Sequence, residues 1–250
     1  MHITRPLYKA ANNEAVACAG TGLEFWIQDQ DDDNSADISY IVVTGPGLSE
    51  GGVRYDRPQG GGPWLINGPV SGGDTWYQLA STCQGSSAAG LTDTQIAAIP
   101  NNATYTLTMY NPNGAVTTAH GNNGAYRNSV SARPMTLAEL ANSSALPSIT
   151  SPATFAAFVS DTSTSPTISA SNINPGYVSW IYVEHDYATS GAISAEADLI
   201  PTSSGTVSRS FSLGTPTGNL LRKEIRVETH DVGLRDIMTH YIYQAMFNPD

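Results

Sequence analysis

The chain has 250 residues, of which 40% are hydrophobic and 8% aromatic, a composition that supports a packed core and excludes a disordered polar tract. Charged residues make up only 13% and the formal net charge is −11. Because Lys9 and Lys223 are the only lysines, no basic surface can neutralise phosphates, and we expect no nucleic-acid partner.

The first half of the chain is predicted to form short strands separated by long loops. Period-two alternation bounded by turn residues predicts strands at 23–28, 38–44, 52–55, 75–80 and 105–110. The acidic segment 29–37 and the Gly- and Pro-rich segments 45–52 and 58–73 are predicted to be loops.

Two short helices are predicted, each with a capping box at its start. They cover 92–99, with Thr92 and Gln95, and 135–141, with Thr136 and Glu139. A Ser- and Pro-rich connector follows the second helix. We therefore predict two domains, 1–146 and 147–250.

The second half has the rhythm of a seven-stranded Greek-key sandwich. Strands are predicted at 154–159, 167–170, 178–185, 193–199, 208–213, 224–230 and 238–244. Alternation in 223–229 predicts a half-buried strand with Ile225 and Val227 facing inward. The predicted fold class is all-β, with two tandem β-sandwich domains.

Cys18 and Cys83 are the only cysteines, and we expect them to form a structural disulfide. The alternative is a pair of tolerated thiols, whereas the spacing disfavours a metal site. The uncharged polar composition suggests an extracellular, cell-surface or periplasmic location. The first residues contain no apolar signal core, so we expect that any export signal has been removed or that the chain was cut from a longer precursor. No apolar run is long enough for membrane insertion.

Two stretches resemble known extracellular modules. Ser179-Trp180-Ile181-Tyr182-Val183, the run from 220 to 231 and the run 239–243 look like a fibronectin type III-like domain. The runs 41–48 and 51–53 are similar to immunoglobulin-like modules of bacterial envelope lipoproteins. The resemblance implies an immunoglobulin-like domain over 1–146, a fibronectin type III-like domain over 147–250, and placement at the cell surface or in the periplasm. Trp26 lies closer to Cys18 than in antibody-type domains, which argues against an ordinary intersheet disulfide.

The acidic loop is the candidate metal site. Alternate carboxylates could converge on calcium, and the candidate ligands are Asp29, Asp31, Asp33 and Asp37. The loop departs from the EF-hand pattern at Asn34 and Tyr40. The alternative is a solvated acidic hairpin loop.

Several motifs suggest catalysis but have simpler structural explanations. Ser49 lies in a GxSxG pattern, yet a strand rather than a helix follows it, so we expect a surface turn. The pairs His185-Asp186 and His230-Asp231 point to opposite faces of a strand and are not expected to act as dyads, with or without His240.

Two further groups of residues could bind ligands. His2 and His120 could brace copper if Met1 were removed. Four aromatic residues could form an exposed platform or belong to the core: Tyr55, Trp64, Trp76 and Tyr77.

The favoured function is a non-catalytic binding, adhesion or spacer module that contacts a protein or carbohydrate surface ligand. A carbohydrate-active protein, either a binding accessory domain or a copper oxygenase, is the alternative. A self-assembling surface subunit that pairs through an edge strand at 238–244 is the third possibility.

Overall fold

Strands dominate the structure, which confirms the all-β prediction. The computed structural model describes residues 3–4, 8–11, 17–27, 38–58, 62–116, 125–142, 144, 146–231 and 233–244. The chain forms two compact units, unit 1 (Met1–Pro6 and Gly20–Glu139) and unit 2 (Leu7–Ala19 and Leu140–Asp250). The predicted boundary after Leu146 lies in the stretch that follows α2 (Leu137–Ala141).

Unit 1 has two strand layers around one core. One layer is a sheet in the order β6-β5-β4-β8-β9, and in the other β3 pairs antiparallel with β1 and β7. The strands are β1 (Ile3–Thr4), β3 (Ala17–Phe25), β4 (Tyr40–Thr44), β5 (Val53–Asp56), β6 (Leu65–Asn67), β7 (Trp76–Ser81), β8 (Thr104–Tyr110) and β9 (Ala125–Ser129). β6 lies within 58–73, so the prediction that this whole segment is loop was wrong.

The core of unit 1 joins the two layers through aromatic rings. Phe25 of β3 contacts Tyr105 of β8 edge-on, with ring centroids 5.3 Å apart, and both side chains are fully buried. Leu79 of β7 and Val43 of β4 belong to the same cluster. Alternation along each strand thus places one face of each layer inward.

Both predicted helices form, and each begins with the predicted capping box. In α1 (Asp93–Ala97) the Thr92 hydroxyl accepts a hydrogen bond from the Gln95 N–H, and in α2 the Thr136 hydroxyl accepts one from the Glu139 N–H. The Asp93 carboxylate also accepts hydrogen bonds from the backbone N–H groups of Leu137 and Ala138, at 2.9 and 3.1 Å. One side chain of α1 therefore caps the start of α2.

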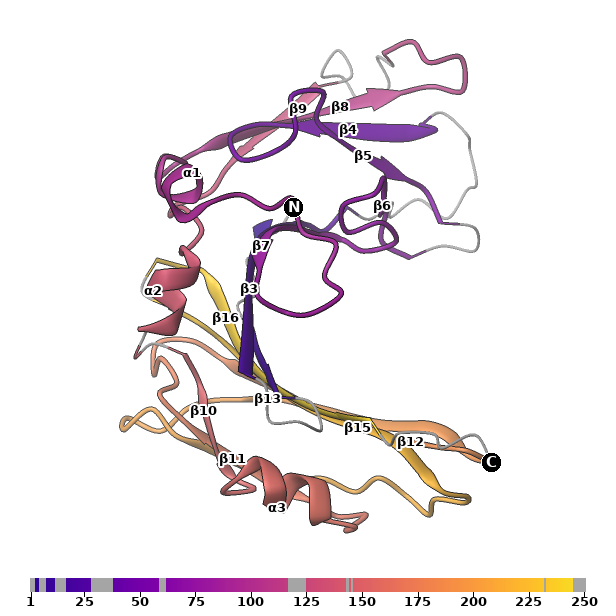
Figure 1. Ribbon diagram of the computed structural model, residues 1–250, viewed down its shortest axis with the longest axis vertical. Helices are drawn as coiled ribbons and strands as arrows, with labels where there is room; N and C mark the ends of the chain where they lie inside the picture. The colour runs from indigo at the N-terminus through magenta and orange to yellow at the C-terminus, as the bar shows by residue number, and fades with distance from the viewer. Residues whose placement is uncertain are drawn as a thin grey trace. The chain divides into compact units, whose positions relative to one another are not determined.

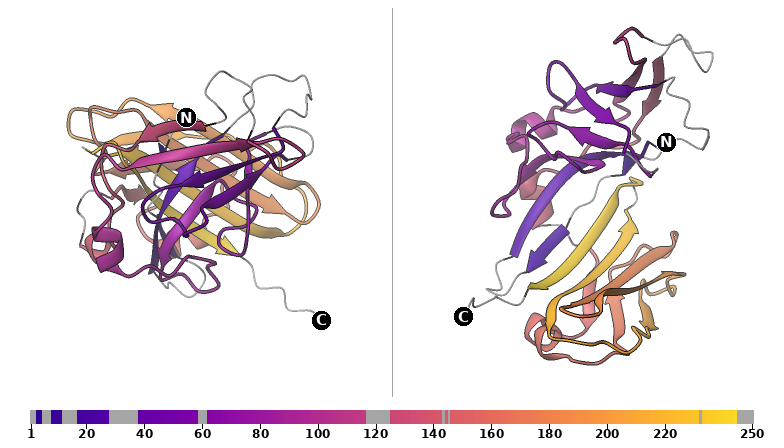
Figure 2. Two further views of the ribbon diagram at one scale, coloured as in Figure 1. Left: turned by 90° about the horizontal axis from the view of Figure 1, so that it is seen from above. Right: turned by 90° about the vertical axis from the view of Figure 1, so that its right-hand side faces the viewer.

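Unit 2 has two sheets that face each other across its core (Figures 1 and 2). The main sheet has the order β2-β16-β15-β12-β13 and the small sheet has the order β10-β11-β14. All pairings are antiparallel except that of β2 with β16. The strands are β2 (Tyr8–Ala11), β10 (Ser148–Ser151), β11 (Thr167–Ser171), β12 (Ser179–Tyr187), β13 (Gly191–Leu199), β14 (Val207–Ser210), β15 (Leu220–His230) and β16 (Asp236–Gln244).

The sides of the two sheets that face each other in unit 2 are apolar, and the other side of the small sheet is polar. Ile181, Val183, Ile225 and Val227 of the main sheet are almost fully buried against Ile168 and other apolar residues of the small sheet. This confirms the inward orientation predicted for Ile225 and Val227. The opposite face of the small sheet carries uncharged hydroxyl pairs, Thr167–Ser210 at 2.7 Å and Ser169–Ser208 at 2.8 Å.

The segment 154–159 is helical, so the strand predicted there was wrong. α3 (Phe155–Ser160) begins at Thr154, whose hydroxyl accepts a hydrogen bond from the Ala157 N–H at 3.1 Å. Phe158 is buried in the core and Phe155 packs against it. Phenylalanines three residues apart share a helix face, and this spacing outweighs the strand preference of Phe and Val.

Candidate functional site

Cys18 and Cys83 form the predicted disulfide. Cys18 lies in β3, and Cys83 follows β7, which is paired with β3. The bond therefore extends the antiparallel ladder of two neighbouring strands. It joins strands of the same sheet and is not an intersheet bond. This agrees with the expectation drawn from the position of Trp26.

The candidate metal ligands cannot be located in this structure. Asp29, Asp31, Asp33 and Asp37 lie outside the described residues, as do His2 and His120. Within the described part of the chain, no group of three or more His, Cys, Asp or Glu side chains is arranged to hold a metal ion. The calcium and copper hypotheses therefore stay predictions.

The GxSxG segment is a turn, as predicted. The Ser49 hydroxyl donates to the Gly52 carbonyl at 2.6 Å, and the Gly52 N–H donates to the Ser49 carbonyl at 2.8 Å. The strand β5 follows. Ser49 is thus engaged within its own turn and has no helix behind it.

The four aromatic residues considered as a platform belong to the interior of unit 1. Tyr55, Trp64 and Tyr77 are at most 5% exposed. Trp76 is half-buried and packs across Gly22 of β3, where an added Cβ would lie 1.9 Å from its Nε1. The core interpretation is therefore confirmed for Tyr55, Trp64 and Tyr77, whereas Trp76 is only half-buried.

The three histidines in the part of the chain that the structure describes have partners other than their sequence neighbours. His185 is buried in unit 2 beside Tyr187, and burial lowers its pKa. His230 Nε2 lies 2.5 Å from the Asp236 carboxylate, whose hydrogen bond raises the pKa of His230. His240 Nε2 lies 2.7 Å from the Glu224 carboxylate. These contacts join each histidine to a residue other than the aspartate that follows His185 or His230 in the sequence.

Aromatic and charged side chains gather on the main sheet of unit 2, on the face opposite the core. We call this the outer face. Trp180 and Tyr182 of β12 stack on one another there, with ring centroids 5.5 Å apart and an interplanar angle of 19°. Both are half-buried. Because residues two apart on a strand share a face, the Trp-Ile-Tyr pattern directs both rings outward.

A buried carboxylate organises the polar side chains of the outer face. Glu224 of β15 is 2% exposed and forms ion pairs with Arg222, with Arg226 at 2.8 Å and with His240. Arg222 also binds Glu184, which accepts a hydrogen bond from the Tyr182 hydroxyl. This set of linked side chains, together with Trp180, is the outer-face cluster.

Electrostatics keep Glu224 ionised. Burial alone raises the pKa of this carboxyl group, but the hydrogen bond and charge of His240 and the charges of Arg226 and Arg222 hold it at about 2. Burial lowers the pKa of His240, while the hydrogen bond and charge of Glu224 act in the opposite direction. The Arg226 guanidinium also lies 5.6 Å from the ring centroids of both Trp180 and Tyr182.

Two carboxylates lie side by side in the cluster and are both bound by one arginine. Glu184 and Glu224 are cross-strand partners, the kind of carboxylate pair that glycosidases use. Glycosidases use one protonated and one ionised member, and Glu224 is the ionised one here because its pKa is held at about 2. Arg222 also engages both carboxylates. The arrangement therefore holds the two aromatic rings in a fixed orientation.

β16 is not an edge strand at its centre. It pairs with β15 along its length, and on its other side His240 and Tyr241 pair with Ala10 and Ala11 of β2. The expectation that 238–244 is an open edge was therefore wrong. The long-range pairing with β2 could not be inferred from local alternation.

No protein-family model matches the chain, and no curated protein is similar to it in sequence. Among the described residues, no helix is long and apolar enough to cross a membrane.

Proposed function

We propose that this protein is an exported, non-catalytic binding or adhesion module, built from an immunoglobulin-like unit 1 and a fibronectin type III-like unit 2. The chain order of unit 2 supports this proposal. Strands β10, β11 and β14 form one sheet and β12, β13, β15 and β16 belong to the other, as in a seven-stranded Greek-key sandwich. The disulfide supports an extracellular or periplasmic location, because such bonds persist in oxidising compartments.

The outer face is the proposed contact surface, and the stacked pair Trp180 and Tyr182 is the observation that carries this assignment. Aromatic residues with few rotatable bonds give large contact areas at low entropic cost, and they are enriched at interfaces. Here the surrounding ion pairs already fix the ring of Tyr182 through Glu184. A ligand would meet a surface that needs little further ordering.

Binding to cell surfaces tests the proposal. The full chain would be incubated with intact bacterial cells, cells shaved with protease, cellulose, chitin and peptidoglycan, and the retained fraction measured. We expect retention on at least one of these surfaces to fall at least tenfold in Trp180→Ala and Tyr182→Ala. Tyr126→Ala is the matched control, because Tyr126 is a 44% exposed aromatic residue on β9 of unit 1.

The pattern of retention identifies the ligand class. Loss of retention after shaving would indicate a protein ligand, and retention on a pure polysaccharide would indicate the carbohydrate-binding alternative. Equal losses in Tyr126→Ala and Trp180→Ala, or no retention on any surface, would contradict the proposal. Circular dichroism of each variant would show that the fold is retained.

Calcium is proposed as a ligand of the acidic loop that carries Asp29, Asp31, Asp33 and Asp37. If it binds only the folded state, it raises the unfolding midpoint by mass action. Thermal unfolding with calcium and then with excess chelator measures this effect. An unchanged midpoint would support the solvated-loop alternative.

A further inference from the structure

β13 is a long strand at the end of the main sheet of unit 2. It has nine residues, each paired with a residue of β12 without a register shift. Within the residues that the structure describes, β12 is the only strand beside it. Its other edge therefore presents backbone N–H and C=O groups along about 30 Å.

This edge lacks most of the features that normally prevent strand pairing. Proteins protect such edges with charged side chains, above all lysine, and with proline, bulges, inward-pointing charges or very short strands. β13 has the sequence Gly-Ala-Ile-Ser-Ala-Glu-Ala-Asp-Leu, which contains no lysine or proline, and it has no bulge. Both of its charges, Glu196 and Asp198, belong to the exposed set of residues, not to the inward set.

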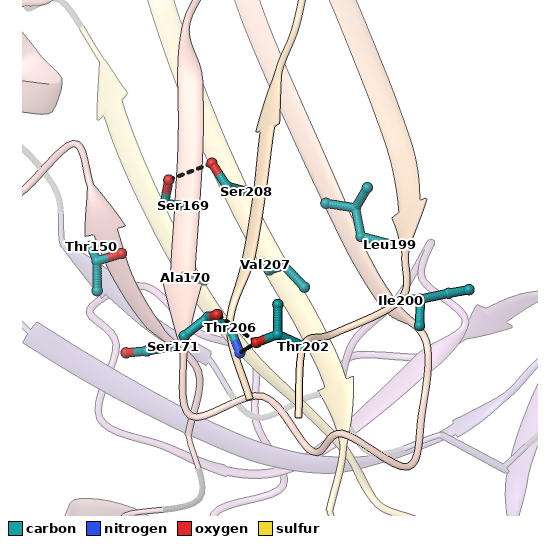
Figure 3. A pocket seen from close by; sticks show the side chains of 10 residues that line it. All are labelled: Thr150, Ser169, Ala170, Ser171, Leu199, Ile200, Thr202, Thr206, Val207 and Ser208. Atoms are coloured by element: carbon teal, nitrogen blue, oxygen red, sulfur yellow. Dashed lines mark hydrogen bonds between the residues drawn. The ribbon is translucent and has the colours of Figure 1, made fainter. Parts of the chain in front are cut away.

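The core beneath β13 is incompletely covered. Ile193, Ala195, Ala197 and Leu199 pack against the core of unit 2 yet are only half-buried, and Ile200 is 86% exposed. The neighbouring strand of the small sheet, β14, has four residues, of which only Val207 is buried. Where the chain passes from β13 to β14, Leu199, Ile200 and Val207 line a hollow of about 490 Å³ together with serine and threonine hydroxyls (Figure 3).

Charge decides which kind of strand fits this edge. Glu196 lies beside Tyr182 and Asp198 beside Trp180, so the exposed side of β13 adds two carboxylates to the outer face. A second copy of this chain would bring the same acidic strand and a net charge of −11, which opposes self-association. A strand with basic residues on that side and apolar residues on the other would pair with the carboxylates and cover Ile193 and Leu199.

We propose that β13 is a docking edge for an extended segment of another protein that alternates basic and apolar residues and adds to the main sheet as a further strand. Main-chain hydrogen bonds supply affinity in this mode, and the alternating side chains supply specificity. The inference goes beyond the proposed function, because it concerns the edge of the sheet and does not require the aromatic pair.

The test uses the full chain and four nine-residue peptide probes at concentrations where each is monomeric. One alternates lysine and valine, and one alternates glutamate and valine. The other two are lysine–valine peptides N-methylated at every valine or at every lysine. Isothermal titration measures affinity, and hydrogen exchange measures protection of residues 191–199. We expect the lysine–valine peptide to bind and protect β13, and at least one N-methylated form to lose binding.

Charge reversal provides the matched comparison. The double variant Glu196→Lys/Asp198→Lys changes only exposed side chains, and we expect it to weaken binding of the lysine–valine peptide at least about tenfold and to favour the glutamate–valine peptide. Glu50→Lys, at an exposed turn of unit 1, is the control and leaves binding unchanged. The variant Trp180→Ala separates the two proposals. We expect it to bind the lysine–valine peptide as wild type does, whether or not the aromatic face has a ligand.

Three results would overturn the proposal. They are equal binding of the lysine and glutamate peptides, undiminished binding of both N-methylated forms, and no response to charge reversal. A concentration-dependent dimer, seen by light scattering without peptide and accompanied by protection of β13, would assign the edge to a second copy instead.

Discussion

Removing the charge of Glu224 tests whether this carboxylate organises the outer face. In Glu224→Gln the guanidinium groups of Arg222 and Arg226 lose their shared buried partner. The fall of the Glu224 pKa from an ordinary 4.5 to about 2 corresponds to about 3 kcal/mol of stability. Losing one member of a buried ion pair costs about 3 to 5 kcal/mol. We therefore expect the free energy of unfolding of unit 2 to fall by about 3 kcal/mol at pH 7.

The effect of pH has a defined sign. Because the folded-state pKa is depressed, the contribution of Glu224 is present above pH 4.5 and is lost as the pH falls towards about 2. The difference between wild type and Glu224→Gln should therefore shrink over that interval. Urea unfolding at several pH values, with hydrogen exchange of peptides from unit 2, measures it. Glu50→Gln, at an exposed position, is the control and should leave the stability unchanged.

Two results would refute this reasoning. A loss below about 1 kcal/mol at pH 7 would mean that the pairs behave like exposed salt bridges. A difference that persists unchanged to pH 2 would mean that the loss does not come from the ionised carboxylate.

Three further predictions concern other parts of the chain. Gly22→Ala should destabilise unit 1 by about 1 to 3 kcal/mol, since the added methyl group meets Trp76, and a double-mutant cycle with Trp76→Ala should recover part of the loss. Replacing Cys18 and Cys83 by serine should cost about 4 kcal/mol in the chain-entropy model, measured by urea unfolding with and without reductant. Lys223→Met should leave the stability unchanged or raise it, because burial lowers the pKa of this 1% exposed amine; a loss above about 2 kcal/mol at pH 7 would contradict this.

Local sequence patterns predicted most strands and both capped helices, because alternation and capping depend on neighbouring residues. The failures have physical causes. The segment at α3 combines strand-favouring residues with a helical spacing of Phe155 and Phe158, and only burial of Phe158 against the core decides between the two. β10 lies in a Ser- and Pro-rich stretch that resembles a linker, and it forms through pairing with the distant β11.

The outer-face cluster could be predicted only in part. Alternation over 223–229 correctly placed Ile225 and Val227 inward and Glu224 and Arg226 on the other side, but it suggested that this other side is a solvated surface. Glu224 is buried because His240 reaches it from β16, and that contact depends on the register that pairs His240 with Arg226. The register follows from the whole sheet, and no local motif encodes it.

The hydroxyl pairs of the small sheet make the two sheets of unit 2 respond differently to a change of pH. Thr167, Ser169, Ser208 and Ser210 do not titrate between acid and alkali, and their mutual hydrogen bonds involve no net charge that dissolved ions could screen. The outer face of the main sheet is organised by Glu224, whose carboxylate becomes protonated in strong acid. In strong acid the small sheet keeps its hydroxyl hydrogen bonds, whereas the outer-face cluster of the main sheet loses the charge that binds Arg222 and Arg226.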